Sequence, residues 1–203
     1  MAIQSDTKRR RSDGERSRRT ILHTAARLAT VEGLDGLSIG RLAEASGISK
    51  GGLYAHFGSK EELQLATVGT AGAIFEEEVV AKGLAAPPGR ARVVALTDAF
   101  LDHLKSGVFP GGCFFASASA EFDTRPGRVM QEIAEFIRGW LGVIARAIVE
   151  ARELGELPAD ADPRQLTFEI GSMLIGANSS YLLEGEVVLD RARVAIARVL
   201  DRP

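Results

Sequence analysis

The residues best suited to chemistry lie close together between positions 49 and 60. The amino group of Lys50 can reach guanine acceptors or a phosphate, and neighbouring hydroxyl, phenol and imidazole groups can donate to phosphate oxygens. Two adjacent glycines interrupt this short helical stretch, although each costs about 1 kcal/mol relative to alanine. Their lack of side chains lets the backbone approach base edges. The pattern indicates a DNA-contacting helix that carries Ser49, Lys50, Gly51, Gly52, Tyr54 and His56, with Lys60 just beyond it.

The remaining sequence contains no recognisable catalytic or metal-binding pattern. The three histidines, at positions 23, 56 and 103, are far apart and have no metal-ligand spacing. No Ser-His-Asp motif, glycine-rich phosphate loop or HExxH motif is present. We therefore expect a protein that is not an enzyme and that uses neither a metal nor a cofactor. Cys113 is the only cysteine, and two interpretations stay open: a small buried hydrophobe or a redox sensor.

Two short helices and a tight turn must hold the DNA-contacting residues in place. Ser38 can cap a helix over residues 39–45, and Ser49 can cap the next one. Gly47 tolerates the positive φ that a tight turn between them needs. An ordinary helical hairpin with a polar outer face would have the same spacing. The glycine pair and the basic outer face favour a helix-turn-helix over residues 38–57.

Charge is distributed unevenly along the chain. Residues 1–60 contain 11 lysines and arginines against six acidic residues, a net charge of +5, whereas the remainder carries −7. This polarity is typical of a nucleic-acid reader attached to a domain of another kind. Residues 1–15 are too polar to bury a core and are predicted to be a mobile basic arm. Its arginines, with Arg16 and Arg18, could enter a minor groove, follow phosphates or stay solvated.

Every long periodic segment reads as a helix, and no run alternates with period two, so we predict an all-α fold. Ser59 and Glu62 form a capping box, and Pro126 and Asp190 are each placed to open a helix. The expected helices cover residues 16–32, 39–45, 49–57, 59–82, 89–106, 114–122, 126–154, 163–184 and 190–200.

The stretch from Gly47 to Leu63 resembles the signature of the TetR family of bacterial regulators. The resemblance implies a helix-turn-helix DNA-binding domain of three helices, residues 16–62, and a larger helical domain, residues 63–203, that binds an effector and dimerises. It also implies that Lys50 and the glycine pair meet base edges. Implied contacts to the DNA backbone are Ser38, Arg41, Ser49, Tyr54, His56 and Lys60.

Two further details bear on this resemblance. Gly52 departs from the family pattern, in which threonine or another side chain is common, so base reading here would depend more on Lys50 and on the N-terminal arm. The segment from Gly111 to Phe122 resembles one found in a subgroup of these regulators.

Seven of the nine phenylalanines and the only tryptophan lie between positions 75 and 140. In the fold that the resemblance implies, the helices that carry them surround the effector pocket. These rings either fill a core or line a cavity, and periodicity does not separate the two. A cavity of this kind would take a largely apolar or aromatic effector. The candidate pocket residues are Phe75, Phe100, His103, Phe109, Cys113, Phe114, Phe136 and Trp140.

The last two predicted helices mix small and large apolar side chains, which lets helices approach closely. As the resemblance implies, two such helices from each of two chains would form a four-helix interface. The alternative is that these residues belong to the intramolecular core. A symmetric homodimer would suit a palindromic operator in double-stranded DNA. The candidate interface residues are Phe168, Gly171, Leu174, Ile175, Val194, Ala197 and Leu200.

These features predict a cytoplasmic, sequence-specific DNA-binding regulator, a repressor that a small effector releases from its operator. One alternative is an activator or architectural factor that binds DNA without any ligand. Another is an enzyme with an appended DNA-binding domain. The sequence shows neither a secretory signal nor an apolar run long enough to cross a bilayer, so we expect no membrane partner.

Overall fold

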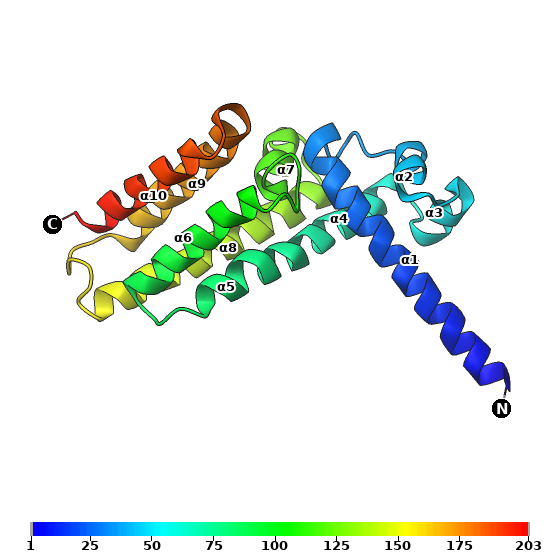
Figure 1. Cartoon of the computed structure of the whole chain (residues 1–203), viewed down its shortest axis with the longest axis horizontal. Helices are drawn as coiled ribbons and strands as arrows, with labels where there is room; N and C mark the ends of the chain where they lie inside the picture. Colours follow the sequence, from blue (N-terminus) through cyan, green and yellow to red (C-terminus); the bar gives the residue numbers. More distant parts are fainter. Residues whose placement is uncertain (1, 203) are drawn as a thin grey trace.

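The computed structural model describes residues 2–202, with side chains for residues 14–53 and 55–202. Within these residues the chain forms ten α-helices and one π-helical segment, and it contains no strand. Figure 1 shows an elongated bundle from which the N-terminal helix projects at one end. The predicted all-α fold class is therefore confirmed.

Helix α1, Ala2–Glu32, is one helix of 31 residues, and its N-terminal half extends away from the rest of the chain (Figure 1). The predicted start at Arg16 is wrong, because the helix continues back through the polar segment. Residues 2–15 contain no proline, and Gly14 is their only glycine, so little in the backbone interrupts a helix there. The mobility of this segment stays a prediction.

Helices α2, Ile39–Ser46, and α3, Lys50–His56, form the predicted helix-turn-helix. The Ser38 hydroxyl accepts a hydrogen bond from the N–H of Arg41 at 3.1 Å and caps α2. Gly47 adopts a φ of +70° in the turn, a conformation that favours glycine. Leu42 and Leu53 are fully buried, and α2 packs against both α1 and α3. We call α1–α3 the head.

Helix α4, Lys60–Phe75, continues through a π-helical turn, Glu76–Val80, into α5, Ala81–Leu84. These three elements form one continuous rod, which corresponds to the single helix predicted over residues 59–82. The Ser59 hydroxyl accepts from the N–H of Glu62 at 3.1 Å, which confirms the predicted cap. The rod runs from the end of the head into the bundle, where Phe75 is only 1% exposed.

Helices α6, Arg90–Lys105, α7, Phe114–Phe122, and α8, Arg128–Glu153, pack around this rod. Helix α8 begins at Arg128 rather than at the predicted Pro126, because Pro126 and Gly127 remain outside the helix. The Arg128 guanidinium instead donates to Glu62 at 2.9 Å and ties the start of α8 to the first turn of α4.

Helices α9, Pro163–Glu184, and α10, Val187–Leu200, form an antiparallel pair that lies along the bundle (Figure 1). Asp162 caps α9, and its carboxylate accepts from the N–H of Arg164 at 2.8 Å. Helix α10 begins before the predicted Asp190, because Gly185, with a φ of +78°, makes the break. The Asp190 carboxylate pairs with Arg193 at 3.1 Å instead. We call α4–α10 the body.

Candidate functional site

The first turn of α3 offers an exposed position without a side chain. Lys50 and Gly51 are exposed, and a Cβ atom at Gly51 would meet no atom within 4 Å. A Cβ atom at Gly52 would lie 3.2 Å from Ile48 Cγ2, so this glycine faces the turn. Its N–H donates to the Ser49 hydroxyl at 3.2 Å, which caps α3. Of the two glycines, Gly51 therefore offers the barer backbone, with the long side chain of Lys50 beside it.

Arg41, a predicted phosphate contact, forms ion pairs within the head. Its guanidinium lies 2.8 Å from the Glu32 carboxylate and 3.1 Å from Glu44. The hydrogen bond with Glu32 is the main cause of the raised pKa of Arg41. Exposed pairs of this kind contribute about 0–1 kcal/mol, so a phosphate can compete with them.

Two more residues that were predicted to contact DNA also have partners within the chain. Lys60 Nζ lies 2.8 Å from Asp35, which also binds Arg125 of the body, and hydrogen bonds from both cations lower the pKa of Asp35. The Arg18 guanidinium lies 5.3 Å from the centre of the Phe57 ring. These contacts hold both cations near the surface of the head.

The other predicted DNA contacts are placed as follows. Ser38 and Arg16 are on exposed positions, although the Ser38 hydroxyl is occupied in capping α2. His56 is half-buried, with its ring centre 6.1 Å from that of Phe57. The side chains of Tyr54 and of the basic run from Lys8 to Arg11 lie outside the described residues.

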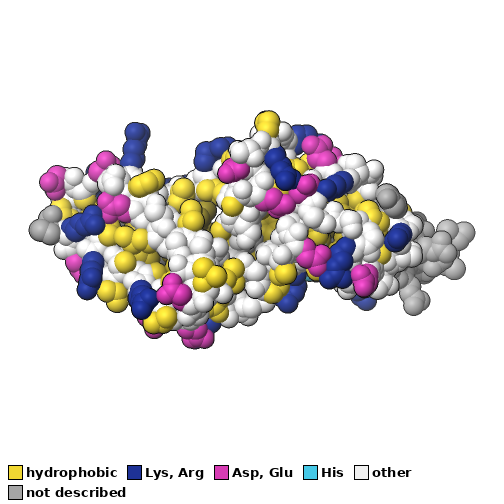
Figure 2. All heavy atoms as spheres, turned by 90° about the horizontal axis from the view of Figure 1, so that it is seen from above, with side chains coloured by type: hydrophobic (Ala, Val, Ile, Leu, Met, Phe, Trp, Pro, Cys, Tyr) yellow, Lys and Arg dark blue, Asp and Glu magenta, His cyan; other side chains and the backbone are white. Residues whose placement is uncertain are grey.

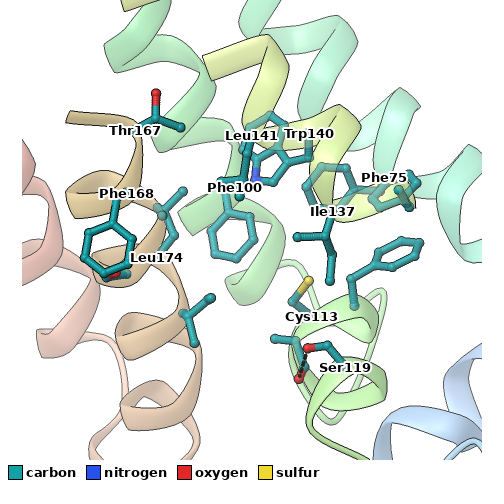
Figure 3. Close-up of a pocket in the computed structure, with 16 residues that line it drawn as sticks. Phe75, Phe100, Cys113, Ser119, Ile137, Trp140, Leu141, Thr167, Phe168 and Leu174 are labelled. Carbon is teal, nitrogen blue, oxygen red and sulfur yellow. Dashed lines mark hydrogen bonds between the residues drawn. The ribbon is translucent and has the colours of Figure 1, made fainter. Parts of the chain in front are cut away.

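A cavity of about 270 Å³ lies in the body, with walls from α4, α6, α7, α8 and α9. Figure 3 shows aromatic and aliphatic side chains around it, with Cys113 and Ser119 at the α7 end. Its lining, within the part of the chain that the structure describes, contains no acidic, basic or histidine side chain. The polar groups available there are small: hydroxyls, one thiol and the indole N–H of Trp140.

The aromatic walls of the cavity support one another. Phe115 and Phe136 stack with centroids 3.6 Å apart and an interplanar angle of 8°. Phe75 meets Phe136 and Trp140 edge-on, at 5.3 and 5.1 Å. The edge-on pairs of Phe75 have a favourable geometry for aromatic rings, and the close contacts among the four rings hold them in place before any ligand enters.

Five predicted pocket residues line the cavity: Phe75, Phe100, Cys113, Phe136 and Trp140. Three others do not. His103 and Phe109 pack together at 5.5 Å, and His103 contacts the ring of Phe75 at 5.8 Å without reaching the cavity. Phe114 turns towards Phe109 at 6.1 Å, because consecutive residues of a helix point about 100° apart and Phe115 takes the cavity side.

The cavity also has a wall that sequence reasoning missed. Helix α9 contributes Phe168, Gly171 and Ile175 among other residues, and α7 contributes Ala116 and Ser119. The mixture of small and large residues on α9 predicted a dimer interface, with the intramolecular core as the alternative. The same mixture leaves room for a cavity, so composition alone does not separate the two roles.

The two titratable groups among the predicted pocket residues are uncharged at neutral pH. Burial raises the pKa of the Cys113 thiol to about 11, which favours the interpretation as a small buried hydrophobe over a reactive thiolate. Burial lowers the pKa of His103, and neither of its ring nitrogens has a hydrogen-bond partner in the described chain. The described residues include no group of three or more potential ligands that could hold a metal ion.

The predicted interface residues divide into two sets. Phe168, Ile175 and Val194 are 69%, 59% and 51% exposed, and Ala197 is also exposed. Gly171, Leu174 and Leu200 are buried within the chain instead, because they face the cavity or the α9–α10 contact.

Further exposed apolar side chains on α9 and α10 are Leu182, Leu183 and Val187. Figure 2 shows hydrophobic side chains among charged ones on the upper face of the molecule, where these helices lie. None of the helices in residues 2–202 is long and apolar enough to span a bilayer.

Two family models match the chain. One, for bacterial regulatory proteins of the tetR family, matches residues 21–67. The other, for the C-terminal domain of tetracyclin repressor-like proteins, matches residues 89–196, which is more than half of the chain. The chain therefore belongs to the TetR family of bacterial transcriptional regulators, as its helix-turn-helix and helical body indicate.

Individual relatives agree with this assignment. The HTH-type transcriptional repressor AcnR of Corynebacterium efficiens is 41% identical over 68 residues, which are 34% of this chain and 36% of AcnR, so the match spans about a third of that relative. A TetR transcriptional regulator from Chloroflexus aurantiacus has a TM-score of 0.86 at 25% identity, covering 94% of this chain and 97% of that one. AibR, in complex with isovaleryl coenzyme A and operator DNA, has a TM-score of 0.73 at 24% identity, covering 90% and 96%.

Proposed function

We propose that the chain is a homodimeric repressor that leaves its operator when a small, uncharged, largely apolar molecule occupies the body cavity. The observation that carries this proposal is a cavity with aromatic walls and no charged lining residue. A charged ligand group would be desolvated there without a partner, which costs several kcal/mol or more. A planar aromatic or alicyclic molecule would instead gain from the stacked and edge-on rings.

The relatives support the two parts of this function in different ways. AcnR is named as a repressor, and its similarity to this chain covers 68 residues. AibR shows that a protein of this fold can hold an acyl coenzyme A together with operator DNA. The present cavity lacks lysine and arginine side chains for the phosphates of such a ligand. We therefore propose an uncharged effector for this chain.

On the DNA side, we propose that Lys50 reads base edges beside the bare backbone of Gly51. Phosphates would be contacted by the remaining predicted residues. Those that form exposed ion pairs, Arg41 and Lys60, can exchange a carboxylate for a phosphate at little cost. The remaining proposed DNA contacts are Arg16, Arg18, Ser38, Ser49, Gly52, Tyr54 and His56.

The exposed apolar side chains of α9 and α10 support the proposed homodimer. Phe168, Ile175, Leu183 and Val194 lie on two adjacent helices, and Leu183 is 86% exposed. A second copy packed on these helices would bury them in a four-helix contact. The two heads would then read half-sites about one or more DNA turns, roughly 34–36 Å each, apart.

Selection of bound duplexes from a random DNA pool tests the DNA-binding part. The full chain should recover a palindromic site, and Lys50→Ala should lose preference at one or two positions in each half-site, by about 1–3 kcal/mol per position. Arg138→Ala, which removes an exposed charge from α8, is the matched control and should recover the original site. Recovery of unrelated, non-palindromic sequences would overturn the proposal that a dimer of this chain binds a palindromic operator.

Trp140 is the only tryptophan and lines the cavity, so its fluorescence reports ligand entry. The neutral probe N-phenyl-1-naphthylamine should quench Trp140 and weaken binding to the selected operator. Its anionic relative 8-anilino-1-naphthalenesulfonate should do so far less, because the cavity offers no cation. A neutral probe that quenches Trp140 without changing DNA affinity would favour a ligand-independent activator or architectural factor.

A further inference from the structure

Residues 107–122, which we call the junction segment, contact both the cavity and the head. The segment comprises the loop before α7 and α7 itself. On one side, Cys113, Phe115, Ala116 and Ser119 line the cavity, and Figure 3 shows Cys113 and Ser119 beside it. On the other side, α7 packs against α1. The same short segment therefore forms a cavity wall and a support for the head.

Glu121, in the last turn of α7, holds the backbone that follows α1. Its Oε2 accepts a hydrogen bond from the N–H of Leu34 at 2.7 Å, and its Oε1 accepts one from the N–H of Asp35 at 2.9 Å. Gly33 has a φ of +85°, and a Cβ atom there would lie 2.9 Å from Glu121 Oε1. Hydrogen bonds to a carboxylate are about twice as strong as neutral ones. One side chain of the body thus fixes the turn that leads into the helix-turn-helix.

Two further contacts join the junction segment to α1. Arg27 Nη1 donates to the carbonyl oxygens of Gly107 and Val108, at 3.0 and 2.5 Å. The N–H of Gly111 donates to the Thr30 hydroxyl at 3.1 Å, and a Cβ atom at Gly111 would collide with the Thr30 carbonyl oxygen. These close approaches leave little freedom for α1 to move independently of the segment.

The junction segment is also tied to α9. The N–H of Cys113 donates to Asn178 Oδ1 at 2.7 Å, and both residues are buried. The start of α7 is therefore held against the helix that supplies another wall of the cavity. The other end of α7 carries Glu121 and contacts the head.

We propose that Glu121 is the positioning residue through which occupancy of the cavity changes the placement of the head. A ligand that presses on Ala116 or Ser119 displaces α7, and a short helix moves as one body because its backbone hydrogen bonds are intact. The displacement then reaches the N–H groups of Leu34 and Asp35 through the Glu121 carboxylate. This inference rests on the proposed function, and it adds a route beside the covalent link that α4 provides.

The test combines a built-in filler of the cavity with loss of the carboxylate. Ala116→Phe places a ring in the cavity from α7, and Ser119→Leu does the same from a second position should the first variant fold poorly. Glu121→Gln keeps the shape of the side chain but replaces one acceptor oxygen by a donor. Operator binding is compared among four chains: the unchanged chain, the filler variant, Glu121→Gln and the double variant. Hydrogen exchange at the amides of Leu34 and Asp35, in the same four chains, needs no DNA.

With Glu121 present, the filler should weaken operator binding about fivefold or more and should change exchange at both amides. With Glu121→Gln, the filler should change affinity less than about twofold. Equal weakening in both backgrounds would overturn the proposal, and so would a filler that changes neither affinity nor exchange. A Glu121-dependent exchange response in a chain that binds no operator would support the coupling and overturn the proposed function.

Two controls separate positioning from general damage. Ala120→Phe adds the same ring at an exposed position of α7 and should have no effect in either background. Asp123→Asn removes a charge from an exposed carboxylate next to α7 and should leave the response to the filler intact. Loss of the response with Asp123→Asn would show that net charge, rather than the two hydrogen bonds of Glu121, carries the effect and would overturn the proposal.

Discussion

The head and the body of this TetR-family regulator are specified over very different distances along the chain. In the head, Ser38 and Ser49 each accept a hydrogen bond from an N–H three residues on, and Ser59 does the same directly after it, where α4 begins. In the body, the cavity is formed by side chains from five helices, from Phe75 to Ile175. The geometry of the helix-turn-helix is therefore largely local, whereas the geometry of the cavity depends on distant parts of the chain packing together.

The two regions also differ in where they carry charged side chains. The head and the first turn of α4 carry exposed cations in weak ion pairs, such as Arg41 with Glu32 and Lys60 with Asp35. The lining of the body cavity has no charged side chain. An exposed ion pair can be exchanged for a phosphate at small cost, while a buried ring cannot be moved without loss of packing. Variants in the body should therefore change stability first, and variants in the head should change DNA affinity first.

The largest expected effect is that of Phe75→Ala. Phe75 is 1% exposed and contacts the rings of Phe100, Phe115, Phe136 and Trp140. Its removal should lower the free energy of unfolding by about 3–5 kcal/mol, measured by urea denaturation. Leu154→Ala, at a side chain that is 60% exposed, should change it by about 0.5 kcal/mol or less. Similar losses for both variants would contradict a cooperatively packed body.

Gly111→Ala tests the contact between the two regions. The new Cβ atom would collide with the Thr30 backbone, which cannot rotate away, so stability should fall by about 1–3 kcal/mol. Limited proteolysis should also cut between head and body sooner. Gly142→Ala, within α8, meets nothing within 4 Å and should be neutral or stabilising. A neutral Gly111→Ala would mean that α1 and the junction segment are not held together.

Gly51→Ala should separate stability from DNA binding. The added methyl group has room in the free protein, and alanine should stabilise α3 by up to about 1 kcal/mol. Operator affinity should nevertheless fall, because the methyl group would lie where we propose that the backbone approaches DNA. Gly139→Ala, in α8, has the same open surroundings and should raise the melting temperature without changing affinity. Unchanged affinity in Gly51→Ala would remove this glycine from the interface.

The smallest effect concerns pH and His103. Burial lowers its pKa below the ordinary 6.5, so below pH 6.5 the unfolded chain binds a proton that the folded chain does not. Stability should therefore fall as pH is lowered from 7 to 5, although Glu78 partly opposes the shift. His103→Phe should flatten this part of the profile in urea denaturation, and His23→Gln, at an exposed position, should not. Equal slopes in all three chains would exclude His103 as the cause.

Much of the head was predictable because its signals are short-range. The serine caps and Gly47 indicated the helix-turn-helix, and the structure has the same elements. The ion pairs of Arg41 and Lys60 were missed, since Arg41 meets Glu32 only after α2 packs on α1, and Lys60 meets Asp35 only after α4 packs on α1. The start of α1 was missed because a polar composition does not exclude a helix, and residues 2–15 contain no proline and only one glycine.

In the body, the sequence predicted the cavity only in part. Clustering of phenylalanines along the chain indicated a cavity or a core between Phe75 and Trp140, and five predicted residues do line one cavity. Phe114 and Phe115 are adjacent and chemically identical, so only the orientation of α7 decides which of them faces the cavity.

The amino-acid sequence by itself determined the fold class, the family, the caps of the helix-turn-helix and the basic character of the N-terminal region. These depend on residues within a few positions of one another. The tertiary structure decided the α9 wall of the cavity, its uncharged lining and the contact of Glu121 with Leu34 and Asp35. The reason is physical: Glu121 and Leu34 are 87 positions apart, and no local pattern specifies which backbone N–H a distant carboxylate will meet.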